Sequence, residues 1–80
     1  MNGLYYYSGQ EVRAADQITY HGDSGVVVFI ATARAGDPSI DWYLDQFRDG
    51  GIMIETNDFG KVFIEAGDID EKLVLISRVK

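Results

Sequence analysis

The stretch Val26-Val27-Val28-Phe29-Ile30-Ala31-Thr32 decides the fold class of this chain. β-Branched and aromatic side chains favour extended backbone, and apolar residues occupy both the odd and the even positions of the stretch. A strand that is apolar on both faces is buried on both faces, as in the middle of a sheet. The sequence therefore predicts a central β-strand over residues 26–32.

Shorter strand-like stretches lie on both sides of this central one. Turn-forming residues separate them, such as those at 21–25 and those at 57–60, where the four-residue connection predicts a hairpin. The predicted flanking strands are residues 4–7, 15–20, 52–56, 61–65 and 73–79, and residues 11–13 are a further candidate strand. Short strands at regular spacing predict a mainly β fold, either a small SH3-like barrel or a strongly bent antiparallel sheet of five to six strands.

One helical pattern interrupts the strands and predicts a short inserted helix. Asp37 suits the N-cap position, and Pro38 suits the first helical position. An apolar face recurs at helical spacing through Ile40, Tyr43, Leu44 and Phe47. The glycines at 50–51 end the pattern. Because 80 residues suffice for one small core, we expect a single domain over residues 1–80.

The formal net charge of −6 restricts the kinds of molecule that the protein is expected to bind. Nucleic acids and anionic membranes are bound through Lys and Arg, and the chain has no run of basic residues. The longest apolar run, residues 26–31, is far too short to cross a membrane. We expect no direct nucleic-acid partner and no membrane, but a basic protein partner. The alternative is that the charge only keeps a small protein soluble.

The chain has no cysteine, which excludes disulfides, thiolate metal sites and thiol nucleophiles. Secreted domains of this size usually carry disulfides, and residues 1–5 lack the basic and apolar segments of a signal peptide. We therefore expect a cytoplasmic protein.

Patterns that would indicate an enzyme are weak. His21 is the single histidine and stands in a glycine-rich turn near Ser24, without a third residue to orient it. The acids at 68–71 lack the glycine and glutamate spacing of a calcium loop. The glycines at 50–51 lack the Lys-Ser/Thr of a phosphate loop. We expect no catalytic residues, no metal and no cofactor.

Residues 15–32 resemble a known barrel motif. Ala15-Asp16-Gln17-Ile18 followed by Gly25-Val26-Val27-Val28-Phe29-Ile30 resembles the KOW motif of small SH3-like barrels, with Ala15 where that motif has glycine. KOW modules usually contact RNA or protein through basic residues, which are missing here. The resemblance thus implies the fold, and as an alternative function a KOW-like accessory module that binds the ribosome or the transcription machinery.

The overall layout is similar to that of small acidic bacterial immunity-type proteins. The shared features are the tryptophan-containing helix, the stretch Gly51-Ile52-Met53-Ile54-Glu55-Thr56 and a leucine-rich final strand. This similarity implies a protein that binds and blocks a partner protein.

Four aspartates at intervals of four residues are the most distinctive pattern, and on a helix they form one stripe: Asp37, Asp41, Asp45 and Asp49. We expect this stripe, with Trp42 beside it, to bind a partner. The alternative is a solvated face, with Asp37 used as a cap and Asp49 already beyond the helix. A second group of candidate binding residues is Glu65, Asp68, Asp70 and Glu71.

Together these features predict a small acidic inhibitor of the immunity or antitoxin type. Its partner would be a toxin, a nuclease or a nucleic-acid-binding defence complex with a basic surface. The oligomeric state is left open by the sequence.

Overall fold

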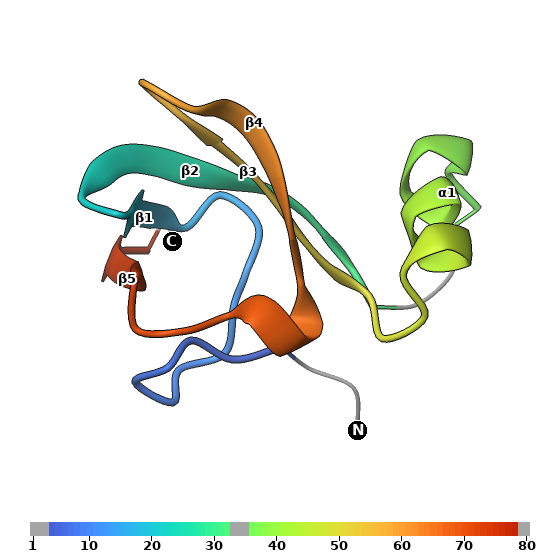
Figure 1. The fold of residues 1–80 in the computed structure, drawn as a ribbon, viewed down its shortest axis with the longest axis horizontal. Helices are drawn as coiled ribbons and strands as arrows, with labels where there is room; N and C mark the ends of the chain where they lie inside the picture. The colour runs from blue at the N-terminus through green and yellow to red at the C-terminus, as the bar shows by residue number, and fades with distance from the viewer. Residues whose placement is uncertain (1–3, 33–35, 79–80) are drawn as a thin grey trace.

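The computed structural model describes residues 4–32 and 36–78, and these form one antiparallel sheet with one short helix. Figure 1 shows the sheet curving around its own interior, with the helix at one side. Along the chain, the elements are β1 (Gln17–Tyr20), β2 (Asp23–Ala31), α1 (Pro38–Gln46), β3 (Gly51–Thr56), β4 (Gly60–Glu65), the 3-10 turn η1 (Ala66–Asp68) and β5 (Leu73–Ser77). The prediction of a mainly β fold with one inserted helix is confirmed.

The sheet is bent but not closed, so the barrel alternative is wrong. The strand order is β4-β3-β2-β1-β5, which leaves β4 and β5 as the two edges. The predicted strand 4–7 and the candidate strand 11–13 are not part of this sheet, because they contribute only an isolated bridge between Tyr5 and Glu11. The predicted strand 73–79 ends as β5 at Ser77, and Val79 lies outside the described residues.

β2 is the central strand, as predicted, and a β-bulge decides how its side chains are divided between two faces. The pairing with β3 shifts register between Val27 and Phe29, so Val28 is an extra residue. Residues two apart on a regular strand share a face, but a bulge reverses this relation. Val27 therefore belongs to the core cluster, whereas Phe29 contacts the ring of Tyr43 on α1.

The inner face of the sheet holds the aliphatic core. Cross-strand neighbours form it, including the row Ile30, Ile52 and Ile64, and fully buried Ile54 stands beside this row. Residues 4–16 run across this face and add two buried side chains, Tyr6 and Val12, to the core. Burial of apolar surface contributes roughly 25 cal/mol per Å², so this face carries most of the folding energy.

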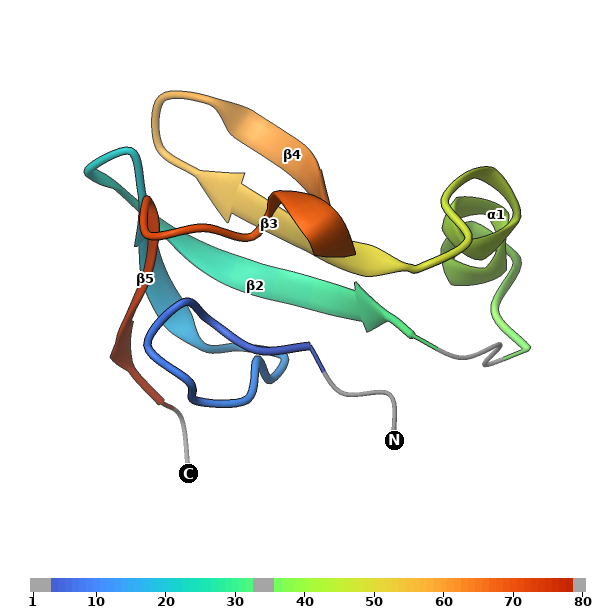
Figure 2. The same cartoon turned by 60° about the horizontal axis from the view of Figure 1, so that its bottom comes forward.

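The outer face carries aromatic rings, and α1 packs on them. The ring of Phe63 on β4 stacks on Tyr43 with centroids 4.4 Å apart and on Phe47 with centroids 5.0 Å apart. No residue of α1 is buried. Figure 2 shows α1 standing beyond one end of β2 and β3, while the N-terminal segment passes under the sheet.

The ends of α1 follow their local signals. The Asp37 side chain accepts a hydrogen bond of 2.9 Å from the backbone N–H of Ser39, as an N-cap does. After the helix, Gly50 has φ +78, and a Cβ at this position would lie 2.0 Å from the carbonyl oxygen of Ala31. Only glycine fits this left-handed backbone at such a close approach, so the chain can turn sharply from α1 into β3.

Candidate functional site

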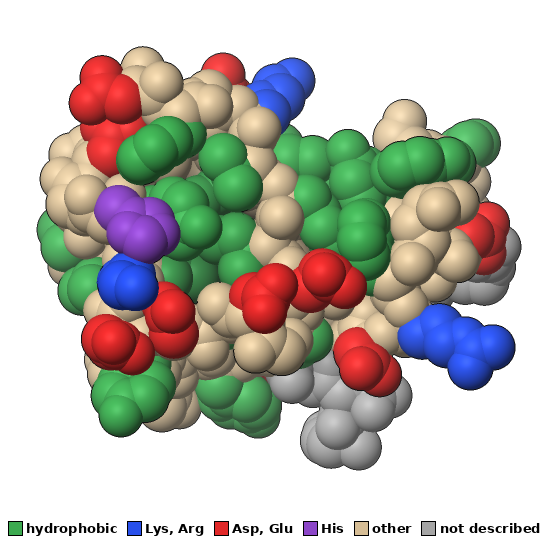
Figure 3. Space-filling view, in the orientation of Figure 1, with side chains coloured by type: hydrophobic (Ala, Val, Ile, Leu, Met, Phe, Trp, Pro, Cys, Tyr) green, Lys and Arg blue, Asp and Glu red, His purple; other side chains and the backbone are tan. Residues whose placement is uncertain are grey.

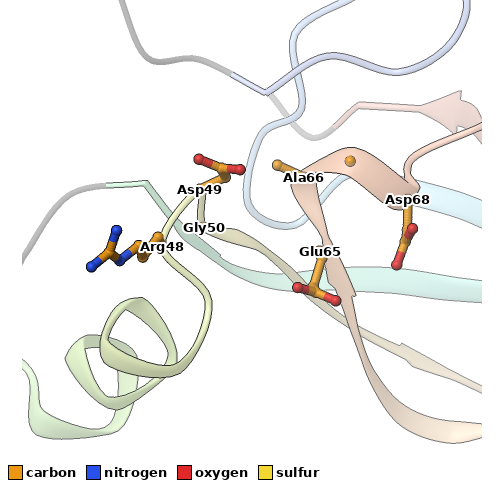
Figure 4. Close-up of a pocket in the computed structure, with 7 residues that line it drawn as sticks. Arg48, Asp49, Gly50, Glu65, Ala66 and Asp68 are labelled. Atoms are coloured by element: carbon orange, nitrogen blue, oxygen red, sulfur yellow. The ribbon is translucent and has the colours of Figure 1, made fainter.

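The candidate site is a hollow of about 200 Å³ between the turn after α1 and the end of β4. Three of its lining residues are carboxylates, Asp49, Glu65 and Asp68, and we call this site the acidic hollow. The other lining residues are Arg48, Gly50, Ala66 and Gly67. Figure 4 shows the three carboxylates arriving from three segments of chain, namely the α1–β3 turn, the end of β4 and η1.

Strand pairing brings these residues together. Gly51 pairs with Glu65 across β3 and β4, and the backbone N–H of Ala66 donates a 3.0 Å hydrogen bond to the carbonyl of Gly50. The turn after α1 and the turn after β4 are therefore held against each other by backbone. Because the backbone is fixed in this way, the carboxylates are presented from a rigid support.

The electrostatic character of the acidic hollow is set by its acids. Its one basic lining residue is Arg48, whose guanidinium points away from the carboxylates in Figure 4. Asp49, Glu65 and Asp68 are all exposed. Figure 3 shows acidic side chains in a broken row along the lower part of this face, below exposed hydrophobic surface, with few basic side chains nearby. The arrangement attracts cationic groups.

The predicted stripe of four aspartates is divided by the structure. Asp37 caps α1, Asp41 is half-buried, and Asp45 is exposed on the helix. Asp41 and Asp45 each take part in an interaction within the structure. The helix ends at Gln46, so Asp49 lies beyond it and belongs to the acidic hollow. The four aspartates thus do not form one ridge along the helix. Asp49 lies instead beside Glu65 and Asp68 of the second acidic group.

That second group is itself divided. Glu65 and Asp68 line the acidic hollow, whereas Glu71 is exposed in the turn before β5. Asp70 is half-buried and its side chain accepts a 3.0 Å hydrogen bond from the backbone N–H of Lys72. Asp70 therefore serves the local turn, as aspartates often do.

Trp42 is the exposed aromatic residue of α1. Its side chain is 52% exposed, and its ring meets Tyr43 edge-on with centroids 4.8 Å apart. Tyr43, in turn, packs against Phe29 and Phe63 on the sheet. Trp42 is thus held on one side by a fixed ring and open to solvent on the other.

Two further features bear on possible chemistry, namely clusters of metal-ligating side chains and the surroundings of His21. In the part of the chain that the structure describes, no set of three or more His, Asp or Glu side chains could hold a metal ion. His21 lies in the two-residue turn between β1 and β2, with φ +51, and its ring packs against Tyr20 and Phe59. Within residues 4–32 and 36–78, no helix is long and apolar enough to span a membrane.

Sequence reasoning missed a buried ionic cluster around Asp16. Its carboxylate accepts hydrogen bonds from the Tyr6 hydroxyl at 2.6 Å, from the Arg13 backbone N–H at 2.9 Å and from the Arg78 Nε at 3.0 Å. Burial alone raises the pKa of a carboxyl, but the hydrogen bonds from Arg78, Tyr6 and Arg13 outweigh burial and hold the pKa of Asp16 below its usual value. Burial, followed by the Asp16 carboxylate, raises the pKa of the Tyr6 phenol. A separation of 62 residues between Asp16 and Arg78 left no local signal for this cluster.

A second carboxylate, Asp23, braces the two hairpins of the sheet against each other. It accepts a 2.7 Å hydrogen bond from the backbone N–H of Asp58, in the turn between β3 and β4. This bond, helped by hydrogen bonds from Thr56, Phe59 and Ser24, holds the pKa of Asp23 below its usual value despite partial desolvation. Asp23 is therefore a structural acid rather than part of a binding surface.

Comparisons with known proteins add no family to this geometry. No protein-family model matches the chain, and neither a curated protein nor a solved structure does. The similarity of residues 15–32 to the KOW motif and the immunity-type layout therefore stay predictions.

Proposed function

We propose that this protein is a small acidic inhibitor that binds a basic partner protein and blocks it. The contact surface is the acidic hollow together with Trp42 on the preceding helix. The protein acts by binding in the cytoplasm and not as an enzyme. Its partner would be a toxin, a nuclease or a nucleic-acid-binding defence complex.

The observation that supports this proposal most is the meeting of two acidic groups. From the sequence, Asp49 belonged to one candidate surface, and Glu65 and Asp68 belonged to another. In the fold all three line the same hollow, and Arg48 points away from them. Carboxylates held close together make the local electrostatic potential more negative. This favours a cationic partner and speeds its approach.

Charge alone does not hold a complex together, and Trp42 supplies the apolar part of the contact. Tryptophan is enriched among the residues that dominate binding energy, above all where a ring is anchored by its neighbours. Trp42 is half exposed yet rests on Tyr43, so little conformational freedom is lost when it is covered. The acidic hollow would govern association, and Trp42 would govern dissociation.

The proposed mechanism is steric and electrostatic. Proteins that act on nucleic acids carry Lys and Arg where phosphates bind. An acidic protein that occupies this basic surface competes with the nucleic acid and covers the site. The net charge of −6 fits this role.

The test is capture of partners from a nuclease-treated extract of the source organism, with the full tagged chain as bait. The first variant combines Asp49→Asn, Glu65→Gln and Asp68→Asn. The matched control combines Glu11→Gln, Glu55→Gln and Asp58→Asn, which removes the same charge from exposed positions outside the acidic hollow. We expect a basic protein that the parent and the control retain and the first variant loses.

Kinetics with the captured protein then separate the two parts of the surface. The acidic-hollow variant should associate about tenfold more slowly at low salt, with a weaker salt dependence. Trp42→Ala should mainly speed dissociation, by a factor of about 30 if it is a dominant contact. Equal capture by the parent and the acidic-hollow variant would rule out this surface. Specific retention of ribosomal proteins or RNA polymerase would support the accessory-module alternative instead.

A further inference from the structure

Residues 4–14 are attached to the rest of the protein in an unusual way. Most of their backbone hydrogen bonds are internal, such as those from Tyr6 to the carbonyl of Gln10 and from Val12 to that of Leu4, and one joins the N–H of Asp16 to the carbonyl of Arg13. Among the described residues, none of them donates a backbone hydrogen bond to a strand of the sheet or accepts one from it. The first such bond, from the N–H of Ala15 to the carbonyl of Val27, comes directly after the segment.

Side chains therefore hold this segment in place, and one ionic cluster dominates them. The Tyr6 hydroxyl reaches Asp16, and the Arg78 guanidinium bonds both Asp16 and the carbonyl oxygen of Glu11. The side chain of Asp16 is 1% exposed and that of Arg78 30% exposed. We call these three residues, Tyr6, Asp16 and Arg78, the clasp. Hydrogen bonds to charged groups are the strong ones, so the clasp is the main polar restraint on residues 4–14.

A pivot lies between the segment and the sheet. Ala15 has φ +71, a left-handed backbone that a residue with a Cβ seldom adopts. The strained backbone at Ala15 can relax only if the chain on one side of Ala15 moves. From Asp16 onward the backbone is tied to β2, because the N–H of Val27 donates to the carbonyl of Asp16 at 3.0 Å. Residues 4–14 are the side that can move.

We propose that residues 4–14 form a lid over the inner face of the sheet, closed by the clasp and opening about Ala15 while the five strands stay paired. Arg78 follows β5, so the closure of the lid depends on the far end of the chain. Opening uncovers the apolar inner face where Tyr6 and Val12 now pack. The acidic hollow and α1 keep their structure, because the clasp makes no hydrogen bond to them.

The test is amide hydrogen exchange of the full chain, resolved by NMR. Tyr6→Phe keeps the buried ring and removes one clasp hydrogen bond, and Arg78→Met removes the guanidinium. The control is Arg13→Met, which removes a base of the lid that is not part of the clasp and whose side chain lies 4.0 Å from that of Glu11. A detached two-stranded loop is not stable alone, so opening exposes the amides of Tyr6, Val12 and Ala15.

We expect these three amides to exchange about tenfold faster or more in Tyr6→Phe and Arg78→Met, and unchanged in the control. The amides of Ile52 and Ile54 in β3 should keep their rates, and Trp42 should keep its fluorescence. Equal acceleration of lid and β3 amides would show global unfolding and overturn the proposal. Unchanged lid amides in both variants would overturn it as well. If Arg78→Met does not fold, the same criteria apply to Tyr6→Phe.

Discussion

The two faces of the sheet are built on different principles. The inner face is aliphatic and closed, with Ile18, Ile52 and Ile54 among its fully buried members. The outer face is aromatic and half open, and the helix that covers part of it has no buried residue. The inner face therefore specifies the fold. The outer face adds a helix, an exposed tryptophan and the acidic hollow without contributing buried helix residues to the core.

This difference between the two faces predicts where amino-acid substitutions are tolerated. Close packing makes an interior sensitive to the loss of a few methylene groups. Rings in stacked or edge-on contact contribute less, about 0.5–1.5 kcal/mol per pair beyond their burial. We expect substitutions to lower stability steeply on the inner face and gently on the outer face.

The largest effect is expected from Ile54→Ala on the inner face. Ile54 is fully buried, and removal of its side chain leaves a cavity, which costs about 2–5 kcal/mol of unfolding free energy. Chemical denaturation monitored by circular dichroism measures the loss. If the alanine variant does not fold, Ile54→Val should still cost about 0.5–1.5 kcal/mol. A loss below this range would show that the inner face is loosely packed.

A smaller loss is expected from Phe63→Ala on the outer face. This change removes the ring on which Tyr43 and Phe47 stack, and the loss of these two ring pairs should cost about 1–3 kcal/mol beyond the lost burial. The helix should loosen while the sheet persists. Trp42 fluorescence should shift, and amide exchange in β3 should stay slow. A loss as large as that of Ile54→Ala would make the outer face part of the folding core and erase the contrast between the faces.

Acid should affect the inner face through Asp16. The pKa of Asp16 is held below its usual value of about 3.9, so its carboxylate stabilises the fold above that pH and stops doing so as the pH falls through the folded pKa. One such group adds a slope of at most about 1.4 kcal/mol per pH unit. Unfolding free energies measured from pH 6 down to pH 2 should show this decline, and Asp16→Asn should flatten it. Asp23, whose pKa is also lowered, adds to the same decline, so Asp23→Asn is the reference.

The smallest effect on stability is expected from Trp42→Ala. Trp42 is 52% exposed and makes one edge-on contact with Tyr43, so its removal should lower the unfolding free energy by only about 0.5–1.5 kcal/mol. Thermal unfolding of the variant and the parent checks this. A stable variant that no longer holds a partner would confirm that Trp42 serves contact. A loss of several kcal/mol would instead make Trp42 a structural residue.

Local signals in the sequence predicted much of this fold. Asp37 and Pro38 marked the start of the helix, and the apolar run at 26–32 marked the central strand. Closure into a barrel could not be decided in this way, because it depends on pairing between β4 and β5, which are distant in the sheet order. Tyr5 and its neighbours have strand-like composition, yet they pack over the core and form only one bridge.

The candidate site was predictable in its residue types but not in its arrangement. Asp49 and Glu65 were both identified as candidate binding residues, and nothing in their spacing showed that β3–β4 register would place them around one hollow. The clasp was not predictable at all, since Asp16 and Arg78 are 62 residues apart. Long-range contacts of this kind depend on the whole topology rather than on any window of sequence.

Because of the bulge at Val28, the number of residues in β2, as well as their types, decides which side chains face outward. Deletion of this single residue would leave Val27 opposite Ile54 and Phe29 opposite Met53, so β2 would alternate regularly and Phe29 would keep its place against Tyr43. Deletion of a regularly paired residue of β2 would instead make the side chains between that position and the end of the strand exchange faces, although no other residue had changed. Among variants of this protein, a one-residue gap in β2 should therefore be tolerated at Val28, which is 42% exposed, and should be rare at the paired positions on either side.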